Sequence, residues 1–244
     1  GDDTQRHLES MIRTAAISVW VVFATLVCSL SAIAVSFLSK GDNRAHLVGR
    51  FWAKSILFVS RVRVSVRGLE HIDPRATYVY MANHQSMYDI LALLGYLPVQ
   101  FRWIAKKELF QIPVFGHAMA RVGYISIDRS DRKSAIMSLQ EAAQKIARGV
   151  SVVVFPEGTR SPDGQILPFK KGAFYLAIDS GRPIVPVVID GSHQVMPKGK
   201  LCIRPGRIVL SINPPVETIP YHHNKEVLME SVRSTMRNDL ARIR

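Results

Sequence analysis

The sequence predicts an α/β protein, in which a mixed central sheet is flanked by helices and preceded by an N-terminal appendage of two membrane-associated helices. Three patterns support this fold class. Residues 15–38 form an uncharged stretch of 24 residues, which is long enough to cross a bilayer as a helix. Beyond residue 62, short β-branched runs alternate with helical segments, as in α/β folds. Residues 152–155 are a continuous apolar run, typical of a strand buried on both faces. We therefore divide the chain into N-terminal membrane-associated helices, residues 1–61, and an α/β domain, residues 62–244.

The first helix, at residues 15–38, is too long for a cleavable signal peptide, and its N-terminal flank is acidic. Its small and hydroxyl-bearing residues share one helical face. They are Ser18, Thr25, Ser29, Ala32 and Ser36. Small residues allow a second helix to approach closely, so we expect a helix to pack on this face.

The second helix is predicted at residues 44–61, after a turn at residues 40–43. One face carries the basic residues His46, Arg50, Lys54 and Arg61, and the apolar residues lie largely opposite: Leu47, Val48, Phe51, Trp52 and Phe58. A basic amphipathic helix of this kind is typical of a membrane interface. Two topologies remain open. The first helix spans the bilayer with the basic side in the cytoplasm, or both helices form a monotopic hairpin in one leaflet.

The charge distribution favours an anionic membrane surface as a partner. The net charge is +13, and residues 39–70 carry seven Lys or Arg against two Asp or Glu, immediately after the apolar stretch. Positive charge beside an apolar segment favours lipid head groups. No recognisable nucleic-acid module accompanies it, which argues against a nucleic-acid partner. The two cysteines, Cys28 and Cys202, are far apart and suggest neither a disulfide framework nor a metal cluster, in keeping with a reducing compartment.

In the α/β domain, strands are predicted from β-branched runs, and their ends from glycine, proline or capping residues. A half-exposed strand begins at Val62, alternates valine with Arg or Ser, and ends at Gly68. Further strands are predicted at residues 77–82, 100–105, 123–127, 152–155, 184–189, 200–203 and 207–212. Helices are predicted at residues 88–97, 114–121, 130–148 and 173–180, and from residue 225 onward. The clearest of them, residues 130–148, has Ser130 or Asp131 as its cap and Gly149 as its stop.

A histidine and an aspartate stand five residues apart, His84 and Asp89, between a predicted strand and the next predicted helix. A carboxylate that holds an imidazole fixes its tautomer and stabilises the imidazolium, so the pair suits a general base. The structural alternative is that Asp89 complements the helix dipole. No cysteine or Gly-x-Ser-x-Gly turn supplies a covalent nucleophile, so the base would act on a substrate hydroxyl. Ser86 lacks a nucleophile elbow, and no ligand set accompanies His84, so no metal is expected.

The turn after the buried strand is a candidate anion site. It reads Phe155-Pro156-Glu157-Gly158-Thr159-Arg160, and Arg160 supplies a planar donor fork suited to a phosphate. A basic run at residues 169–172 precedes the next helix, whose N-terminus also favours anions. The alternative is an ordinary turn with a solvated basic run. Another candidate is Arg129, which binds phosphate or pairs with Asp128 or Asp131.

Taken together, the motifs resemble the glycerolipid acyltransferases. These motifs are Asn-His-x4-Asp at residues 83–89, Gly-x4-Asp-Arg at 123–129, Phe-Pro-Glu-Gly-Thr-Arg at 155–160, and the Val-Pro strand. Within that family the chain is most similar to the bacterial type of lysophosphatidic acid acyltransferase, over roughly residues 62–215. Supporting strings lie at residues 105–110, 112–116 and 168–174.

The resemblance implies a lipid-biosynthetic enzyme without a cofactor. His84, oriented by Asp89, would deprotonate the sn-2 hydroxyl of lysophosphatidic acid. The alkoxide would then attack the thioester of acyl-CoA or acyl-carrier protein, without an acyl-enzyme. Arg160, Arg129 and Lys106 or Lys107 would hold the phosphate, within a binding loop that includes Glu157, Gly158 and Thr159. Lys106 or the turn N–H groups near Gly158 would stabilise the oxyanion, and Glu157 would hold the loop.

The expected location is the inner or cytoplasmic membrane, with the site near its cytoplasmic face. Two alternatives remain. One is an acyltransferase for another lysophospholipid or for glycerol 3-phosphate, and the other is a non-catalytic lipid-binding protein.

Overall fold

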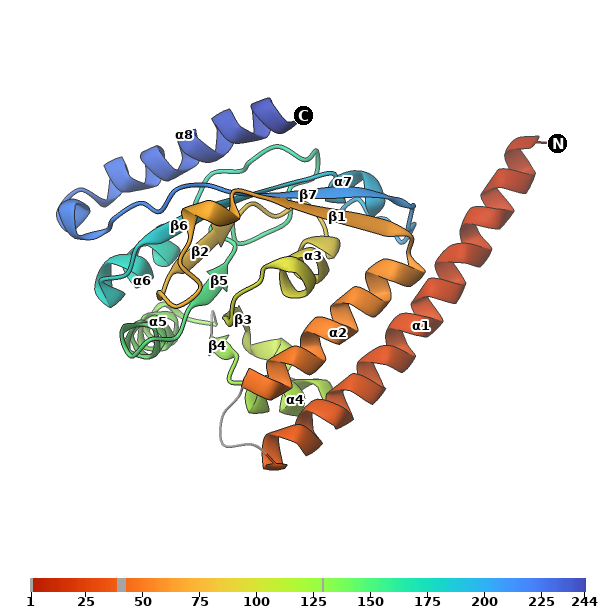
Figure 1. The fold of residues 1–244 in the computed structure, drawn as a ribbon, viewed down its shortest axis with the longest axis horizontal. Helices are drawn as coiled ribbons and strands as arrows, with labels where there is room; N and C mark the ends of the chain where they lie inside the picture. Colours follow the sequence, from red (N-terminus) through yellow and green to blue (C-terminus); the bar gives the residue numbers. More distant parts are fainter. Residues whose placement is uncertain (1, 39–42, 129) are drawn as a thin grey trace.

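The computed structural model describes residues 2–38, 43–128 and 130–244 (Figure 1). Residues 40–42 of the expected turn between the first two helices lie outside the described residues, and so does Arg129. The two N-terminal helices lie side by side along one flank of the molecule, and the α/β body occupies the rest.

A mixed sheet forms the centre of the molecule, as predicted. Within the described residues it has seven strands in the order β1-β7-β6-β2-β5-β3-β4. All neighbouring strands are parallel except β6 and β7, which are antiparallel. The strands are β1 (Val62–Arg67), β2 (Val79–Ala82), β3 (Arg102–Lys106), β4 (Ile125–Ile127), β5 (Val152–Val154), β6 (Ile184–Asp190) and β7 (Gly206–Ile212).

Helices cover both faces of this sheet (Figure 1). On one face, α3 (Tyr88–Tyr96) packs against the strands and α2 (Asn43–Val59) packs outside α3. The other face is covered by α5 (Arg132–Ala147), α6 (Lys171–Ser180) and α8 (Lys225–Ile243). The remaining elements are α1 (Asp2–Leu38), α4 (Phe115–Arg121), α7 (Ser192–Val195) and the short 3-10 helices η1 (Leu69–His71), η2 (Lys107–Gln111) and η3 (Ile219–Tyr221).

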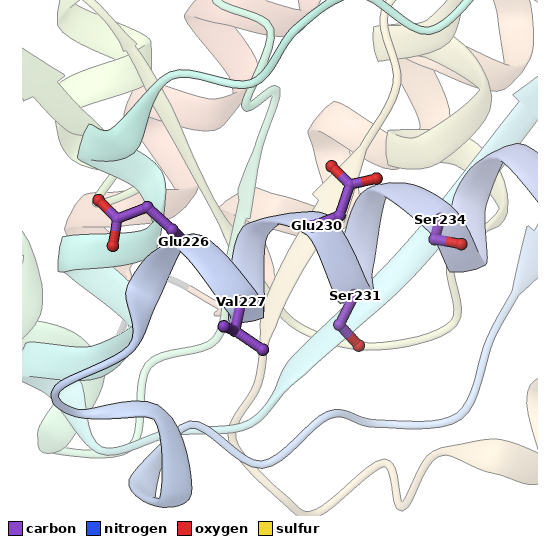
Figure 2. A pocket seen from close by; sticks show the side chains of 5 residues that line it. All are labelled: Glu226, Val227, Glu230, Ser231 and Ser234. Atoms are coloured by element: carbon purple, nitrogen blue, oxygen red, sulfur yellow. The ribbon is translucent and has the colours of Figure 1, made fainter.

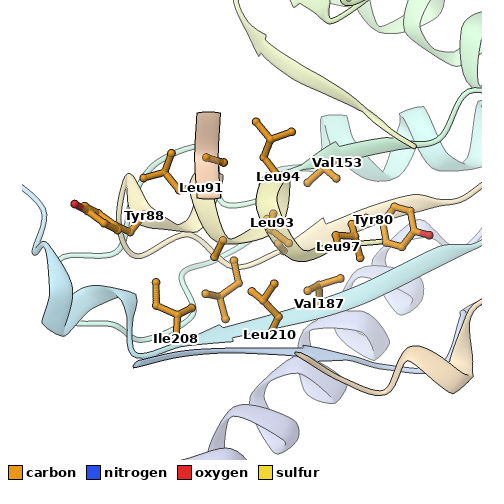
Figure 3. Packing of buried hydrophobic residues seen from close by; sticks show 14 of the residues in the cluster. Tyr80, Tyr88, Leu91, Leu93, Leu94, Leu97, Val153, Val187, Ile208 and Leu210 are labelled. Carbon is orange, nitrogen blue, oxygen red and sulfur yellow. The ribbon is translucent and has the colours of Figure 1, made fainter. Parts of the chain in front are cut away.

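The central strands are buried on both faces because each one feeds two cores. In β2, Tyr80 belongs to the core under α3, whereas Val79 and Met81 belong to the core under α5, α6 and α8. Figure 3 shows the first of these cores, where Leu93 of α3 and Leu97, the residue after this helix, lie over the strands. An apolar surface around the whole of α3 explains why a helix of this length is stable between the sheet and α2.

The small-residue face of α1 packs against α2, which confirms the expected close approach of a second helix. Ala32 and Ser29 are buried, and Trp52 of α2 donates its indole Nε1–H to Thr25 Oγ1 at 3.0 Å. The opposite face of α1 is exposed and apolar. Residues Leu8–Leu38 are long and apolar enough to cross a membrane, judged by length and composition.

The basic face of α2 is turned toward the protein, and not toward the solvent as in a lone interfacial helix. The Arg50 guanidinium donates to the carbonyl oxygens of Leu97 at 2.7 Å and Val99 at 3.1 Å, beyond the end of α3. His46 is fully buried, and burial lowers its pKa to about 3. The apolar face is the outer one, since Phe58 is 83% exposed. The charge of Arg50 is therefore directed into the body of the protein, whereas the Lys54 side chain is exposed.

Residues 200–203 do not form the predicted strand. The N–H of Ile203 donates to Thr14 Oγ1 of α1 at 3.2 Å, and the N–H of Arg204 donates to Val195 O at 2.9 Å. These donors are satisfied by a side chain of α1 and by the carbonyl of the last residue of α7, and not by a strand partner. The other predicted helices and strands are present, and most of their ends are shifted by a few residues. The exception is α1, which begins at Asp2 and not at residue 15, because the helix continues through the charged residues before the apolar stretch.

Candidate active site

The candidate motifs meet at one edge of the sheet because their strands are parallel. β2 is parallel to β5 and β6, and β3 is parallel to β5 and β4. The carboxyl ends of these strands therefore lie at the same edge, where sites in α/β sheets are usually built. His84 follows β2, residues 155–160 follow β5, Lys106 ends β3, and residue 129 comes shortly after β4.

His84 and Asp89 form a direct hydrogen-bonded pair at this edge. His84 Nδ1 lies 2.8 Å from Asp89 Oδ2, and the same oxygen accepts the backbone N–H groups of Gln85 at 2.6 Å and Ser86 at 2.8 Å. Asp89 is the second residue of α3 and is 0% exposed. It therefore combines the two roles considered from the sequence, since it binds N–H groups at the start of the helix and also orients the imidazole.

The imidazole ring of His84 is held from its face as well as from its edge. It stacks on Phe155, with ring centroids 3.9 Å apart and 10° between the planes, and Phe155 stacks in turn on Trp103 at 5.6 Å. An ionised Asp89 requires a proton on Nδ1, which leaves the lone pair on Nε2. The side chain of His84 is 12% exposed. The arrangement thus leaves a basic nitrogen on a ring that is partly accessible to solvent, which suits a general base.

Two amides fix the turn that carries His84. Asn83 exchanges two hydrogen bonds with the backbone of Ile189: its Nδ2 donates to the carbonyl oxygen at 2.9 Å, and its Oδ1 accepts the N–H at 2.7 Å. Gln85 Nε2 donates to the same carbonyl oxygen at 3.0 Å and to Gly164 O at 3.1 Å. The sequence reasoning assigned no role to either amide. The available signal was a pair of uncharged polar residues directly after a buried strand.

Glu157 joins the histidine turn to the loop after β5. Its Oε1 accepts the N–H of His84 at 2.8 Å, and its Oε2 accepts the N–H of Leu167 at 3.0 Å. The residue is 2% exposed, and burial raises its pKa to about 7, against the lowering effect of these two N–H donors. Glu157 thus connects the backbone of His84 to that of Leu167. We refer to residues 155–167, which contain the candidate anion turn, as the anion-site loop.

Glu157 is expected to make the protein less stable as the pH rises. Its pKa of about 7 in the folded protein lies above the ordinary value of 4.5, so the folded state binds this proton more tightly than the unfolded chain does. Below pH 4.5, the ordinary pKa, this group contributes fully to the free energy of unfolding. The contribution is lost as the pH rises to about 7, the pKa in the folded protein, and the change is about 3 kcal/mol. Glu157→Gln should remove this slope.

Urea unfolding of both proteins in detergent, at a series of pH values between those two pKa values, measures the difference. Equal pH dependence in the wild type and the variant would contradict the prediction.

The turn that carries Arg160 is held by a lysine outside the predicted motif. Lys198 Nζ donates to the carbonyl oxygen of Arg160 at 2.8 Å and lies 3.3 Å from Thr159 Oγ1. Gly158 has φ of 70°, and its N–H donates to Phe155 O at 3.1 Å, so this N–H is already bonded within the turn. This left-handed backbone conformation explains the glycine. Lys198 lies in an irregular loop, where no sequence pattern marked it.

The other predicted cations lie further along the same edge. Lys106 is exposed at the end of β3, and Lys107 donates to Asp128 Oδ2 at 2.9 Å. Asp131 caps α5 by accepting the N–H of Ser134 at 2.9 Å. β4 is separated from β2 by β5 and β3, which corresponds to roughly 14 Å across the sheet. Strand β4 is therefore the most distant from β2 of the strands that precede a candidate motif.

A shallow surface hollow over α8 is unrelated to these motifs. Figure 2 shows the side chains that line it, all of them from α8: Glu226, Val227, Glu230, Ser231 and Ser234. The Glu226 carboxylate is paired with Lys171 at 2.9 Å. The hollow shares no residue with the histidine turn or the anion-site loop, so the candidate site remains at the carboxyl edge of the sheet.

A histidine–aspartate pair beside a candidate anion-binding turn, on a mixed α/β sheet, is an arrangement that suits a transferase. Residues 63–190 match the family model described as acyltransferase, and the chain belongs to the acyltransferase family. The family resemblance predicted from the sequence is thereby confirmed.

Relatives of known name are also acyltransferases. The 1-acyl-sn-glycerol-3-phosphate acyltransferase of Limnanthes douglasii is 36% identical over 179 residues, which are 73% of this chain and 62% of that enzyme. The alpha form from Bos taurus is 37% identical over 202 residues, or 82% of this chain and 68% of the bovine one. The chain thus spans about three-fifths of the length of the Limnanthes enzyme.

A solved structure matches almost the whole chain. It is the crystal structure of the 1-acyl-sn-glycerophosphate (LPA) acyltransferase PlsC from Thermotoga maritima, with a TM-score of 0.84 and 29% identity. The match covers 98% of this chain and 97% of the other, and so includes the N-terminal helices.

Proposed function

We propose that this chain transfers an acyl group to the sn-2 hydroxyl of 1-acyl-sn-glycerol 3-phosphate, giving phosphatidic acid for phospholipid biosynthesis. The observation that carries the proposal is the hydrogen bond of 2.8 Å between His84 and the buried Asp89, beside the turn that bears Arg160. A lipid-binding protein would need neither a fixed imidazole tautomer nor a buried carboxylate behind it. The names of the relatives agree with this acceptor.

In the proposed mechanism His84 acts as a general base. Its Nε2 takes the proton of the acceptor hydroxyl, and the oxygen attacks the thioester carbonyl of acyl-CoA or acyl-carrier protein. The tetrahedral intermediate collapses with loss of the thiolate, which recovers the proton from the imidazolium. The imidazolium is stabilised by Asp89 while it exists.

The geometry supports direct transfer without an acyl-enzyme. Ser86, the hydroxyl nearest to His84 in the sequence, donates its Oγ–H to Met196 O at 2.8 Å, and its Oγ lies 3.2 Å from the N–H of Tyr88. This hydroxyl is thus engaged in holding the turn, and the acceptor lipid itself provides the attacking oxygen.

Cations at the carboxyl edge would bind the acceptor's phosphate. Arg160 is the nearest to the histidine turn along the sheet, and Lys106 ends the more distant strand β3. Arg129, which lies outside the described residues, is proposed as a further phosphate partner on the basis of its sequence motif. Because the Gly158 N–H is bonded to Phe155 O, Lys106 and the N–H groups of Thr159 and Arg160 remain as the proposed partners of the oxyanion.

The N-terminal helices would hold the enzyme on a membrane as a monotopic hairpin. α1 contacts the body near Thr14, which bonds Ile203, and again near Ala32, which packs against Val122 of the segment after α4. A helix that crossed the bilayer would draw both of these regions into the hydrocarbon. Burial of polar groups of these regions in hydrocarbon would be energetically unfavourable. Insertion of only the outer apolar faces of α1 and α2 into one leaflet avoids it. The proposed location is the inner or cytoplasmic membrane, with the site on its cytoplasmic side near anionic lipids.

Two outward phenylalanines on α2 provide a test of this membrane contact. Phe51 is 67% exposed and Phe58 is 83% exposed, so replacing both with serine should leave the fold intact. Loss of two inserted aromatic side chains should weaken binding to phosphatidylglycerol-containing vesicles by roughly 10- to 100-fold. Vesicle co-sedimentation measures this, with Ile219→Ser, also exposed but on η3, as the control. Equal binding by both variants would contradict the contact.

The function itself is tested by acyl transfer with purified protein in detergent. Lysophosphatidic acid is mixed with a long-chain acyl-CoA or acyl-carrier protein, and free thiol and phosphatidic acid are followed. Glycerol 3-phosphate and other lysophospholipids are assayed in parallel. Activity only on one of these acceptors would assign the enzyme to that substrate, and inactivity with every acceptor and donor would reject the proposal.

A further inference from the structure

The short segment after α7 contacts both halves of the candidate site. Met196 O accepts the hydroxyl of Ser86 at 2.8 Å, which lies in the histidine turn. Two residues later, Lys198 donates to Arg160 O at 2.8 Å, in the anion-site loop. The segment follows β6, whose carboxyl end lies at the same edge of the sheet. Its position relative to both motifs is therefore fixed by hydrogen bonds at each end.

The ammonium group of Lys198 is bonded to neutral partners. These are a carbonyl oxygen and the hydroxyl of Thr159. Among the ion pairs of the described residues, each within 4.0 Å, none includes Lys198. Within the described part of the chain no carboxylate is paired with this ammonium, which lies against the backbone of the residue that carries the guanidinium. Lys198 and Arg160 together, beside one turn, attract an anion more strongly than either cation does alone.

A phosphomonoester has more charge than one guanidinium can neutralise. It carries about −1.5 to −2 near neutral pH, whereas Arg160 contributes a single positive charge. A phosphodiester, as in lysophosphatidylcholine, carries one negative charge, which its own choline group offsets. A second cation on this turn therefore favours the monoester over the diester.

We infer that Lys198 is a specificity-determining residue, which lies against the turn of Thr159 and Arg160 and supplies the second positive charge for the acceptor's phosphate. The inference rests on the proposed function, because it names the residue that selects the acceptor in that reaction. It assigns Lys198 to acceptor binding and not to the chemical step.

Steady-state kinetics of three variants test this role. Lys198→Met should raise KM for 1-oleoyl lysophosphatidic acid by about tenfold, the worth of one charge-assisted hydrogen bond. The turnover number and the KM for acyl-CoA should stay near wild-type values. Preference for lysophosphatidic acid over lysophosphatidylcholine should fall by a similar factor. Lys198→Arg should restore most of the lost affinity, since it keeps the charge and the donors. The control is Lys200→Met, which removes an equal charge from an exposed position of the same loop.

The outcomes separate this inference from the proposed function. Equal behaviour of Lys198→Met and Lys200→Met would overturn the role of Lys198 while leaving the proposed function intact. A fall in turnover that is the same for both acceptors would also overturn it, because that result describes a structural lysine. A wild-type protein with no activity on lysophosphatidic acid would overturn the proposed function first, and this inference with it.

Discussion

His84→Ala is expected to lower the turnover number for acyl transfer by about a thousandfold, within the range usual for loss of a general base. In the wild type, Nδ1 is bonded to Asp89 at 2.8 Å, and Nε2 is the nitrogen left to receive the hydroxyl proton. Alanine supplies no proton acceptor, so the acceptor hydroxyl would have to attack without activation. The KM for both substrates should change little, because the ring is not part of the anion-binding turn. Thiol release from acyl-CoA measures the rate.

The variant must be shown to be folded, because the imidazole also stacks on Phe155 at 3.9 Å. Thermal unfolding in detergent provides that check. His117→Ala is the matched control, since His117 is exposed on α4 and away from the carboxyl edge of β2. A folded His84→Ala protein with a rate close to that of His117→Ala would show that another group acts as the base.

The meeting of the two main motifs was predictable from local sequence features. Val152–Val154 and Val79–Ala82 are apolar runs, each followed by polar residues, and both form central parallel strands. Residues after the carboxyl ends of adjacent parallel strands must lie together. Periodicity and helix caps also located most elements, as with Asp131 at the start of α5. These signals act over a few residues and survive in a single sequence.

Contacts between distant segments were not predictable. Asn83 and Ile189 are 106 positions apart, and Lys198 and Arg160 are 38 apart. Nothing in the pattern around any of these residues identifies its partner, because a hydrogen-bond donor is compatible with many acceptors. The same reason explains the wrongly predicted strand at residues 200–203, where a hydroxyl from α1 satisfies a backbone N–H. A short apolar run such as Leu201, Cys202 and Ile203 cannot show whether such a partner is nearby.

The orientation of α2 is a second feature that the sequence alone could not predict. Its sequence defines a basic face and an apolar face, but amphipathicity alone does not say which face meets protein. Here Arg50 and Lys54 contact the body, the first through carbonyl oxygens and the second over the ring of Tyr96 at 5.2 Å. Long basic side chains can cover apolar surface while their charged ends bind carbonyls or rings. With the apolar face outward, the helix is suited to contact lipid tails more than head groups.

Asp89→Asn is expected to lower the turnover number by roughly 100- to 1000-fold while preserving the shape of the site. Asp89 Oδ2 accepts three hydrogen bonds, whereas Oδ1 is buried without a hydrogen-bond partner among the described residues. An asparagine can therefore place its carbonyl oxygen where Oδ2 lies and its amide where Oδ1 lies. The hydrogen bond to His84 survives, but the negative charge that stabilises the imidazolium is removed.

A double variant distinguishes this role from that of a helix N-terminal acid. If Asp89 acts through His84, the combination of Asp89→Asn with His84→Ala should be no slower than His84→Ala alone, since a missing imidazole leaves the carboxylate nothing to orient. If Asp89 only stabilises the start of α3, its substitution should lower the melting temperature and reduce the rate by the same factor in either background. Rates and melting temperatures of the four proteins, measured in one detergent, decide between these outcomes. Independent effects of the two substitutions would contradict the pair as a catalytic unit, because the hydrogen bond of 2.8 Å would then be structural.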